Sequence, residues 1–197
     1  MRKIIWTCIL ASILCSSCAQ IATSGAQALY NHNDVKKSLD DNLATLHANQ
    51  ALYVKSNQFK NTDINIATYH SEMLLTGQVP TPWQKNQAES IVKTISNVSH
   101  VYNFITVSPP LPPLKQVSDA WLTTKIKAKL IASNDVDGRQ IKVVTEDGTV
   151  YLMGILQQDQ AEAAVDIASN TDGVQKVIKM FSYIHISKAT DGFSENS

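Results

Sequence analysis

The sequence predicts an α+β fold made of two tandem α-β-β-α-β domains, each a three-stranded sheet packed against two helices. Three observations predict this class. A stretch from Ile64, INIATYHSEMLLTG, returns in altered form from Ile141 as IKVVTEDGTVYLMG. Within each copy, two runs rich in β-branched residues flank a short turn, which is typical of a β-hairpin. Segments with helical periodicity precede and follow each hairpin.

The repeat is recognised by similar residues at matching positions. Gly77, which ends the first hairpin, matches Gly154, and beyond these glycines the copies realign after one extra residue in the first. Each copy has about 75 residues, too few to bury much surface alone, so we expect the two to pack together. The other matching pairs are Ile64/Ile141, Ile66/Val143, Thr68/Thr145, Leu75/Leu152, Ala88/Ala164, Ile91/Ile167, Val92/Ala168, Val98/Val174 and Val101/Val177.

The second copy, 117–186, has the clearer signals. A helix is predicted over 119–132, because its apolar residues fall on one stripe. Strands are predicted over 141–145 and 149–155, and the Asp147-Gly148 pair between them is a two-residue turn signal, since glycine tolerates positive φ. The apolar stripe of the helix consists of Leu122, Ile126 and Leu130.

A second helix and a third strand complete this copy. Apolar residues recur at i, i+3, i+4 and i+7 from Ala161, and Asp172-Gly173 predicts the helix end, where glycine suits a left-handed cap. A strand is predicted over 174–186. The recurring residues are Ala161, Ala164, Val165 and Ala168.

The first copy, 34–107, follows the same plan with weaker signals. His70-Ser71 occupies the turn position of its hairpin, and its second helix follows the turn Pro80-Thr81-Pro82. Its opening helix carries three leucines at helical spacing, which we expect to face the core. These are Leu39, Leu43 and Leu46.

The first residues predict export and lipidation. Residues 1–17 combine a basic start with an apolar run too short to span a bilayer, which is typical of a cleaved signal peptide. Cys15-Ser16-Ser17-Cys18 resembles a bacterial lipobox, in which Cys18 would carry the lipid, although Cys15 stands where leucine is usual. All three cysteines lie within these 18 residues, so the mature chain has no internal disulfide. The alternative is a plain secretory signal.

Three segments are predicted to connect or flank the domains. Residues 18–33, small and polar, suit a lipidated tether, and residues 187–197 suit a flexible tail. The join between the copies, SPPLPPLKQ over 108–116, is proline-rich and predicts an extended, semi-rigid linker.

Net charge argues against nucleic acid as a partner. The chain has 17 basic and 17 acidic residues, and loss of Arg2 and Lys3 with the signal leaves 15 against 17. Bulk charge will not hold such a protein on a polyanion, so any attraction to anions must come from a local patch.

A set of apolar residues and glycines recurs at matching positions: Val150, Leu152, Gly154, Gly173, Val174 and Val177 in the second copy, and Met73, Leu75, Gly77, Val98 and Val101 in the first. This pattern resembles the BON domain family. The resemblance is close from about Val117 to Ile184 and looser from Asp34 to Val107, where Asn97 replaces the expected glycine.

The resemblance to lipoproteins with two BON domains implies a non-enzymatic role in outer-membrane integrity. It also implies binding of anionic, phosphatidylglycerol-like phospholipid through the second domain, and recruitment to the division site. The implied location is the outer membrane of a Gram-negative bacterium, lipid-anchored and facing the periplasm, with Ala19 after Cys18 resembling the sorting signal.

The helix over 119–132 offers a candidate lipid-contact face. At 100° per residue, Trp121 lies about 140° from the predicted core stripe. Tryptophan suits a membrane interface, and lysines add about 1 kcal/mol each near an anionic leaflet. The matching first-copy helix has no tryptophan and carries Asp40 and Asp41, which we expect to be exposed and to repel such a leaflet. The predicted phospholipid-binding residues are Trp121, Thr124, Lys125, Lys127 and Ala128.

Other interpretations remain open at this point. Trp121 could be buried against the first domain or the linker, or could anchor a protein partner such as the outer-membrane assembly machinery. Trp83 is expected to pack at the start of its helix. Four aromatic residues on the last strands are expected in the core or on a sheet face: Tyr102, Phe104, Phe181 and Tyr183.

No motif indicates catalysis, a metal or a cofactor. The five histidines are scattered without metal-ligand spacing, and the glycine-rich phosphate loop and the G-x-S-x-G elbow are both missing. We expect a protein that is not an enzyme.

Overall fold

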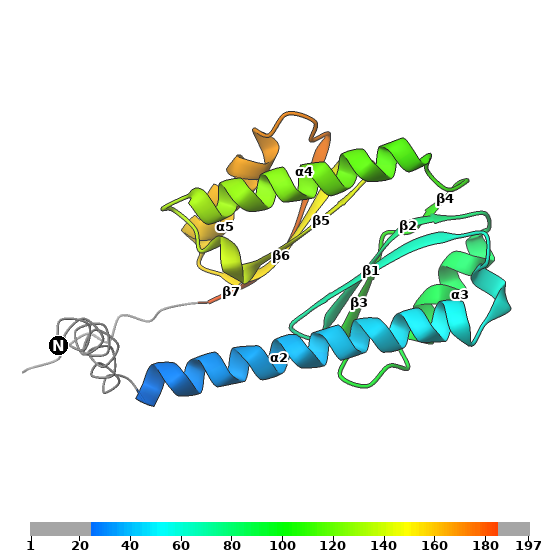
Figure 1. Ribbon diagram of the computed structural model, residues 1–197, viewed down its shortest axis with the longest axis horizontal. Coiled ribbons are helices and arrows are strands. Elements are labelled where there is room, and N and C mark those ends of the chain that lie inside the picture. Colours follow the sequence, from blue (N-terminus) through cyan, green and yellow to red (C-terminus); the bar gives the residue numbers. More distant parts are fainter. Residues whose placement is uncertain (1–24, 185–197) are drawn as a thin grey trace, which may run out of the picture. The chain divides into compact units, whose positions relative to one another are not determined.

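A computed structural model describes the backbone of residues 25–184 and the side chains of residues 35–184 (Figure 1). The predicted signal peptide, Cys18 and the tail lie outside the described residues. The chain divides into two units, 1–39 and 40–197, and the second contains both sheets. Helix α2, Gly25–Asn49, overlaps the predicted tether, so residues 25–33 are helical. The alanine-containing, proline-free run GAQAL explains this correction, since it favours a helix.

The first domain follows α2 with a hairpin, a helix and a returning strand. β1 pairs antiparallel with β2, which pairs in parallel with β3 and, further along, with β4. Its elements after α2 are a π-helical turn Gln50–Val54, a 3₁₀ turn Asn57–Phe59, β1 Asp63–Tyr69, β2 Glu72–Val79, α3 Pro82–Val92, β3 His100–Asn103 and β4 Thr106–Val107.

The second domain repeats this order, and the predicted α-β-β-α-β plan is confirmed. Its sheet has the order β5-β6-β7, antiparallel then parallel. The first helix begins at Pro113, which shortens the predicted linker to 108–112, because proline lacks only an N–H that the first turn does not use. The elements are α4 Pro113–Ala132, a 3₁₀ turn Gly138–Gln140, β5 Ile141–Glu146, β6 Thr149–Leu156, α5 Gln158–Ser169 and β7 Lys176–Tyr183.

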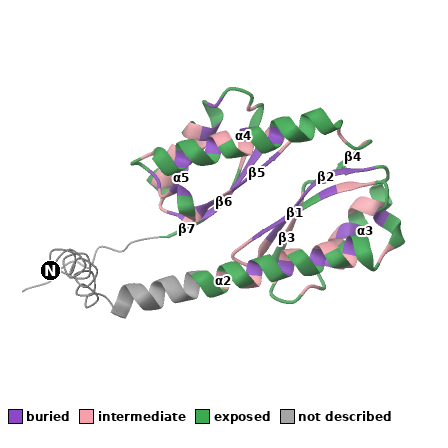
Figure 2. Ribbon diagram, viewed as in Figure 1, coloured by how far each residue is buried: buried purple, intermediate pink, exposed green. Residues whose placement is uncertain are grey.

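Each domain has a hydrophobic core between its helices and one face of its sheet (Figure 2). In the second domain the predicted stripe of Leu122, Ile126 and Leu130 is buried, as expected. In the first domain the predicted leucine stripe is wrong, since the three leucines are at least half exposed and smaller residues face the sheet. Small side chains let the helix approach the strands closely. Leu39, Leu43 and Leu46 are exposed, and Ala44, Ala48 and Leu52 are buried.

An aspartate in each opening helix holds the hairpin turn of its own domain. Asp119 accepts hydrogen bonds from the N–H groups of Asp147 (2.8 Å) and Gly148 (3.0 Å). Asp41 does the same for His70 (2.6 Å) and Ser71 (2.9 Å). The expectation that Asp41 is solvent-exposed is therefore wrong. It can be buried because it accepts hydrogen bonds from two backbone N–H groups that the turn leaves unpaired.

Backbone conformation explains the departure at Asn97. Gly173 has a φ of 102°, and Asn97, at the matching position of the first domain, has a φ of 67°. Asparagine is among the few residues other than glycine that tolerate this left-handed region. Asn97 can therefore replace the family glycine without a change of turn.

The two domains pack through the sheet faces that their helices leave bare. Residues alternate between the faces of a strand, so Leu75 lies in the first core while Leu74 lies between the domains. The Tyr69 hydroxyl donates to the Gln140 carbonyl at 2.7 Å across the contact. The buried residues between the domains are Ala67, Leu74, Val144, Tyr151, Met153 and Met180.

Candidate functional site

The outward face of α4 carries the predicted lipid-contact residues. Trp121 is 60% exposed, and the Lys125 Nζ lies 4.9 Å from the centroid of its ring, a cation–π contact. Burial of the opposite stripe fixes this orientation, as the spacing of 100° per residue predicts. The structure excludes burial of Trp121 against the first domain or the linker within the described chain. Thr124, Lys127 and Ala128 are also exposed, and Lys125 is half-buried.

Three apolar residues that the sequence analysis missed extend this face. Leu114, Val117 and Ile131 are 81%, 66% and 56% exposed. Leu114, Val117 and Trp121 follow one another at i, i+3 and i+7, so they form one ridge on the helix. Leu114 falls in the segment 108–116 that its prolines mark as a linker, and Val117 and Ile131 lie near the ends of the predicted helix. We call Leu114, Val117 and Trp121 the α4 ridge.

Acidic residues engage two of the lysines near the α4 ridge. The Lys125 Nζ lies 3.7 Å from an oxygen of Asp172, whose side chain is fully exposed. Lys115 forms an ion pair with Asp147, and its hydrogen bond to that carboxylate raises the pKa of Lys115. Lys129 donates to the Thr171 hydroxyl at 3.0 Å. Within residues 35–184, no hydrogen bond or ion pair engages the exposed Lys127, so its charge faces solvent.

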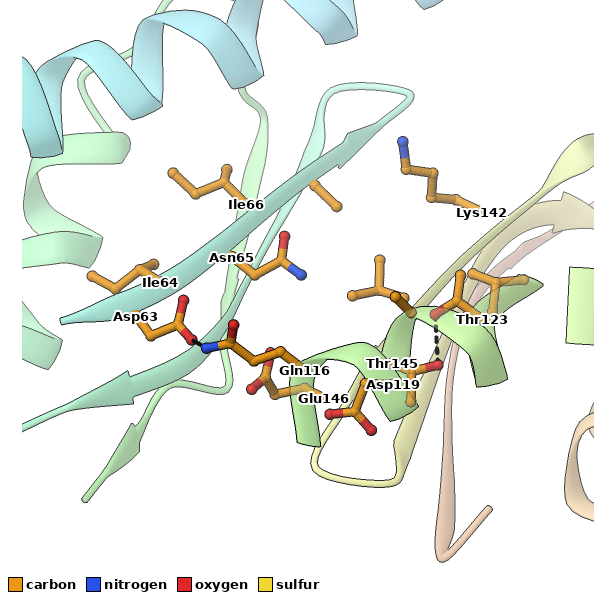
Figure 3. A pocket seen from close by; sticks show the side chains of 14 residues that line it. Asp63, Ile64, Asn65, Ile66, Gln116, Asp119, Thr123, Lys142, Thr145 and Glu146 are labelled. Carbon is orange, nitrogen blue, oxygen red and sulfur yellow. Dashed lines mark hydrogen bonds between the residues drawn. The ribbon is translucent and has the colours of Figure 1, made fainter. Parts of the chain in front are cut away.

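A polar crevice of about 600 Å³ lies between β1, β5 and the first half of α4 (Figure 3). Gln116 donates to a carboxylate oxygen of Asp63 at 2.5 Å, and the Thr123 hydroxyl bonds that of Thr145 at 2.8 Å. Lys142 projects into the space from β5. The crevice is separate from the α4 ridge and was not anticipated from the sequence.

The remaining aromatic residues divide between surface and interior. Trp83 is 54% exposed at the start of α3, so the expectation that it packs there is wrong. Tyr102 packs between the domains, Phe181 packs against the second core, and Phe104 lies 5.2 Å from Tyr151 between ring centroids. Tyr183 is 40% exposed.

The described residues contain neither a cluster of metal-ligating side chains nor a helix able to cross a bilayer. Side chains from 35 to 184 contain no group of three or more metal-ligating residues placed to hold an ion. No helix described between residues 25 and 184 combines the length and the hydrophobicity needed to cross a bilayer.

The family comparison agrees with this architecture. The BON domain family matches residues 40–109 and 118–184, one match in each domain. The chain therefore belongs to the BON domain family and contains two BON domains.

Among individual proteins, the chain is similar to the outer membrane lipoprotein DolP of Haemophilus influenzae, with 44% identity over 112 residues, which cover 57% of this chain and 58% of DolP. It is 38% identical to the 21 kDa hemolysin of Actinobacillus pleuropneumoniae, over 57% of this chain and 58% of that protein. It is 34% identical to the osmotically-inducible protein Y of Escherichia coli, over 52% and 53%. The matches thus span between half and three fifths of these relatives.

Proposed function

We propose that this protein is a non-enzymatic outer-membrane lipoprotein that binds anionic phospholipid through the α4 ridge and the neighbouring lysines. The exposed Trp121 beside Lys125 carries the proposal. Burial of a large apolar ring normally stabilises a fold, so a ring exposed among lysines indicates a binding surface. An indole at the headgroup level, with ammonium groups reaching lipid phosphates, fits that surface.

The lipobox-like stretch and the similarity to DolP support an anchor at Cys18 in the outer membrane, with the domains in the periplasm. They likewise support a role in envelope integrity at the division site. Metabolic labelling with palmitate tests the anchor: the chain should be labelled, and Cys18→Ser should not. Equal labelling of both would contradict it.

An alternative use of the same surface is a protein contact. Aromatic residues with charged neighbours are frequent anchors of protein interfaces, so Trp121 could bind a component of the outer-membrane assembly machinery. This alternative requires no affinity for lipid, and a vesicle experiment separates the two.

The first test is tryptophan fluorescence of residues 19–197 carrying Trp83→Phe, which leaves Trp121 as the single tryptophan. Because Trp121 is 60% exposed, we expect emission typical of a solvated indole in buffer. Vesicles containing phosphatidylglycerol should shift it to the blue, and salt should weaken the shift because it screens surface charge.

The control is a neutral phosphatidylcholine vesicle, which should shift the emission much less. Unchanged emission with both vesicles would overturn the lipid proposal and favour the protein contact. An equal shift with both vesicles would show that the lysines do not contribute to binding.

A further inference from the structure

The crevice between β1 and β5 is bounded by two sheet edges. Among the described strands, β1 pairs only with β2, and β5 pairs only with β6. An edge strand presents unpaired backbone N–H and C=O groups, which can pair with another extended chain. The remaining wall of the crevice is the first half of α4.

On β5, the register shows which backbone groups face away from β6. Glu146 and Thr149 flank a two-residue turn, so they exchange both hydrogen bonds. Alternate residues along the strand repeat this pattern, and those between them point their backbone groups outward. These are Val143 and Thr145, and both line the crevice.

The same count on β1 makes Ile64 and Ile66 outward, and both line the crevice too. One observation supports the count. The Ile64 N–H donates to the Tyr53 hydroxyl at 2.8 Å, which requires it to point away from β2. Among the described residues, no hydrogen-bond partner engages the outward backbone groups of Ile66.

Charged side chains mark the two ends of the crevice. Lys142 is half-buried, burial lowers its pKa, and no hydrogen bond or ion pair engages it within residues 35–184. Four residues along β5, or about 13 Å, Glu146 lies near Asp63. Burial raises the pKa of the Glu146 carboxyl, although Gln78 donates to it at 2.7 Å. Among the described residues neither charge forms an ion pair, although the charge of Asp41 raises the pKa of Lys142 and that of Lys127 lowers it.

We propose that this crevice binds an extended peptide segment of a partner protein, which adds as a strand to β1 or β5. An acidic residue of the segment would face Lys142, and a basic residue would face Glu146 and Asp63. The strand edges supply hydrogen bonds to any sequence, and the charged ends select for this pair of residues. The proposal does not depend on lipid binding, because the α4 ridge lies outside the crevice.

The test is selection of heptapeptides from a random displayed library on residues 19–197, which include every residue of both hydrophobic cores. Counter-selection uses Asn65→Trp, because Asn65 is exposed and projects into the crevice, where an indole would fill the space (Figure 3). Asn134→Trp, at an exposed position that does not line the crevice, is the matched control.

We expect enriched peptides with an acidic and a basic residue near opposite ends. They should bind Asn134→Trp like the parent chain, Lys142→Gln at least fivefold more weakly and Asn65→Trp at least tenfold more weakly. In amide NMR spectra, Ile66, Val143 and Thr145 should shift. Lys142→Glu should select a basic residue in place of the acidic one.

The proposal is overturned if no enriched peptide distinguishes the parent chain from Asn65→Trp while both melt alike. Peptides that shift amides of the α4 ridge and none of β1 or β5 would also overturn it, because they would report binding at the ridge. Were Asn65→Trp to fail to fold, an unchanged charge preference of Lys142→Glu would overturn it independently.

Discussion

At the scale of the residue, Lys125 has two partners that should act in opposite directions on the proposed membrane contact. The Trp121 ring leaves its charge available, while Asp172 competes with lipid phosphate for it. Because Asp172 is fully exposed, solvent and salt screen the pair and keep it weak. If the proposed lipid contact forms, Asp172 should therefore lower the affinity for an anionic surface.

Asp172→Asn tests this moderation. Removal of the competing charge should raise affinity for phosphatidylglycerol vesicles roughly two- to fivefold at low salt. Asp135→Asn removes the same charge from an exposed loop position and is the control. A comparable gain in both variants, measured by vesicle sedimentation, would mean that only net charge matters.

A second prediction concerns the contribution of Asp119 to stability. Asp119→Ala removes two charge-assisted hydrogen bonds to the turn amides, of which the one to Gly148 is buried, so the free energy of unfolding should fall by about 2–4 kcal/mol. Urea denaturation measures the loss. Asp159→Ala, at an exposed position, should cost much less, and equal losses would remove the special role of Asp119.

At the scale of the element, α4 and α2 show what helical periodicity in the sequence can and cannot predict. It identified Leu122, Ile126 and Leu130 as the buried stripe of α4, and hence the outward direction of Trp121. The start of α4 was missed because prolines indicate a linker equally well. On α2 the hydrophobicity and helical spacing of the three leucines predict the wrong buried face. Alanines face the sheet there, and sequence gives no measure of how closely helix and strands approach.

The length of α4 leads to a prediction about the ridge. Leu114→Ser and Val117→Ser should each weaken vesicle binding about fivefold, because each removes roughly 1 kcal/mol of apolar burial at the interface. Melting temperature should hardly change, since both side chains are exposed.

The control for the ridge is Val54→Ser. Val54 is 78% exposed in the first domain, so its substitution should leave vesicle binding unchanged. Normal binding by both ridge variants would restrict the contact to Trp121 and its lysines.

At the scale of the whole molecule, the internal repeat predicts two domains that pack together. The structure confirms this packing within residues 40–197, the unit that contains both sheets. Which residues make the contact could not be derived. Successive residues of a strand point to opposite faces of the sheet. Leu74 and Leu75 are equally apolar, so the sequence does not show which of them faces the core and which faces the other domain. The crevice could not be derived for a related reason, because the residues of β1 (63–67) and β5 (142–146) that line it are at least 75 positions apart in the sequence.

Leu74→Ala tests coupling between the domains. The cavity left between the sheets should lower stability by about 2–4 kcal/mol. Hydrogen exchange should quicken in β5–β7 as well as in β1–β3, because Leu74 packs against residues of both sheets. Unchanged exchange in the second domain would show that the domains unfold independently.

The contact between the sheets also bears on why the unit occurs twice. A single α-β-β-α-β unit has helices for only one face of its sheet, so Tyr151, Met153 and Met180 would meet water if the second domain stood alone. Such a bare sheet face invites association with any other chain. Duplication supplies the cover from within the same polypeptide. Each domain thus covers the apolar sheet face of the other, and a truncation that removes one should increase the tendency of the remaining domain to aggregate.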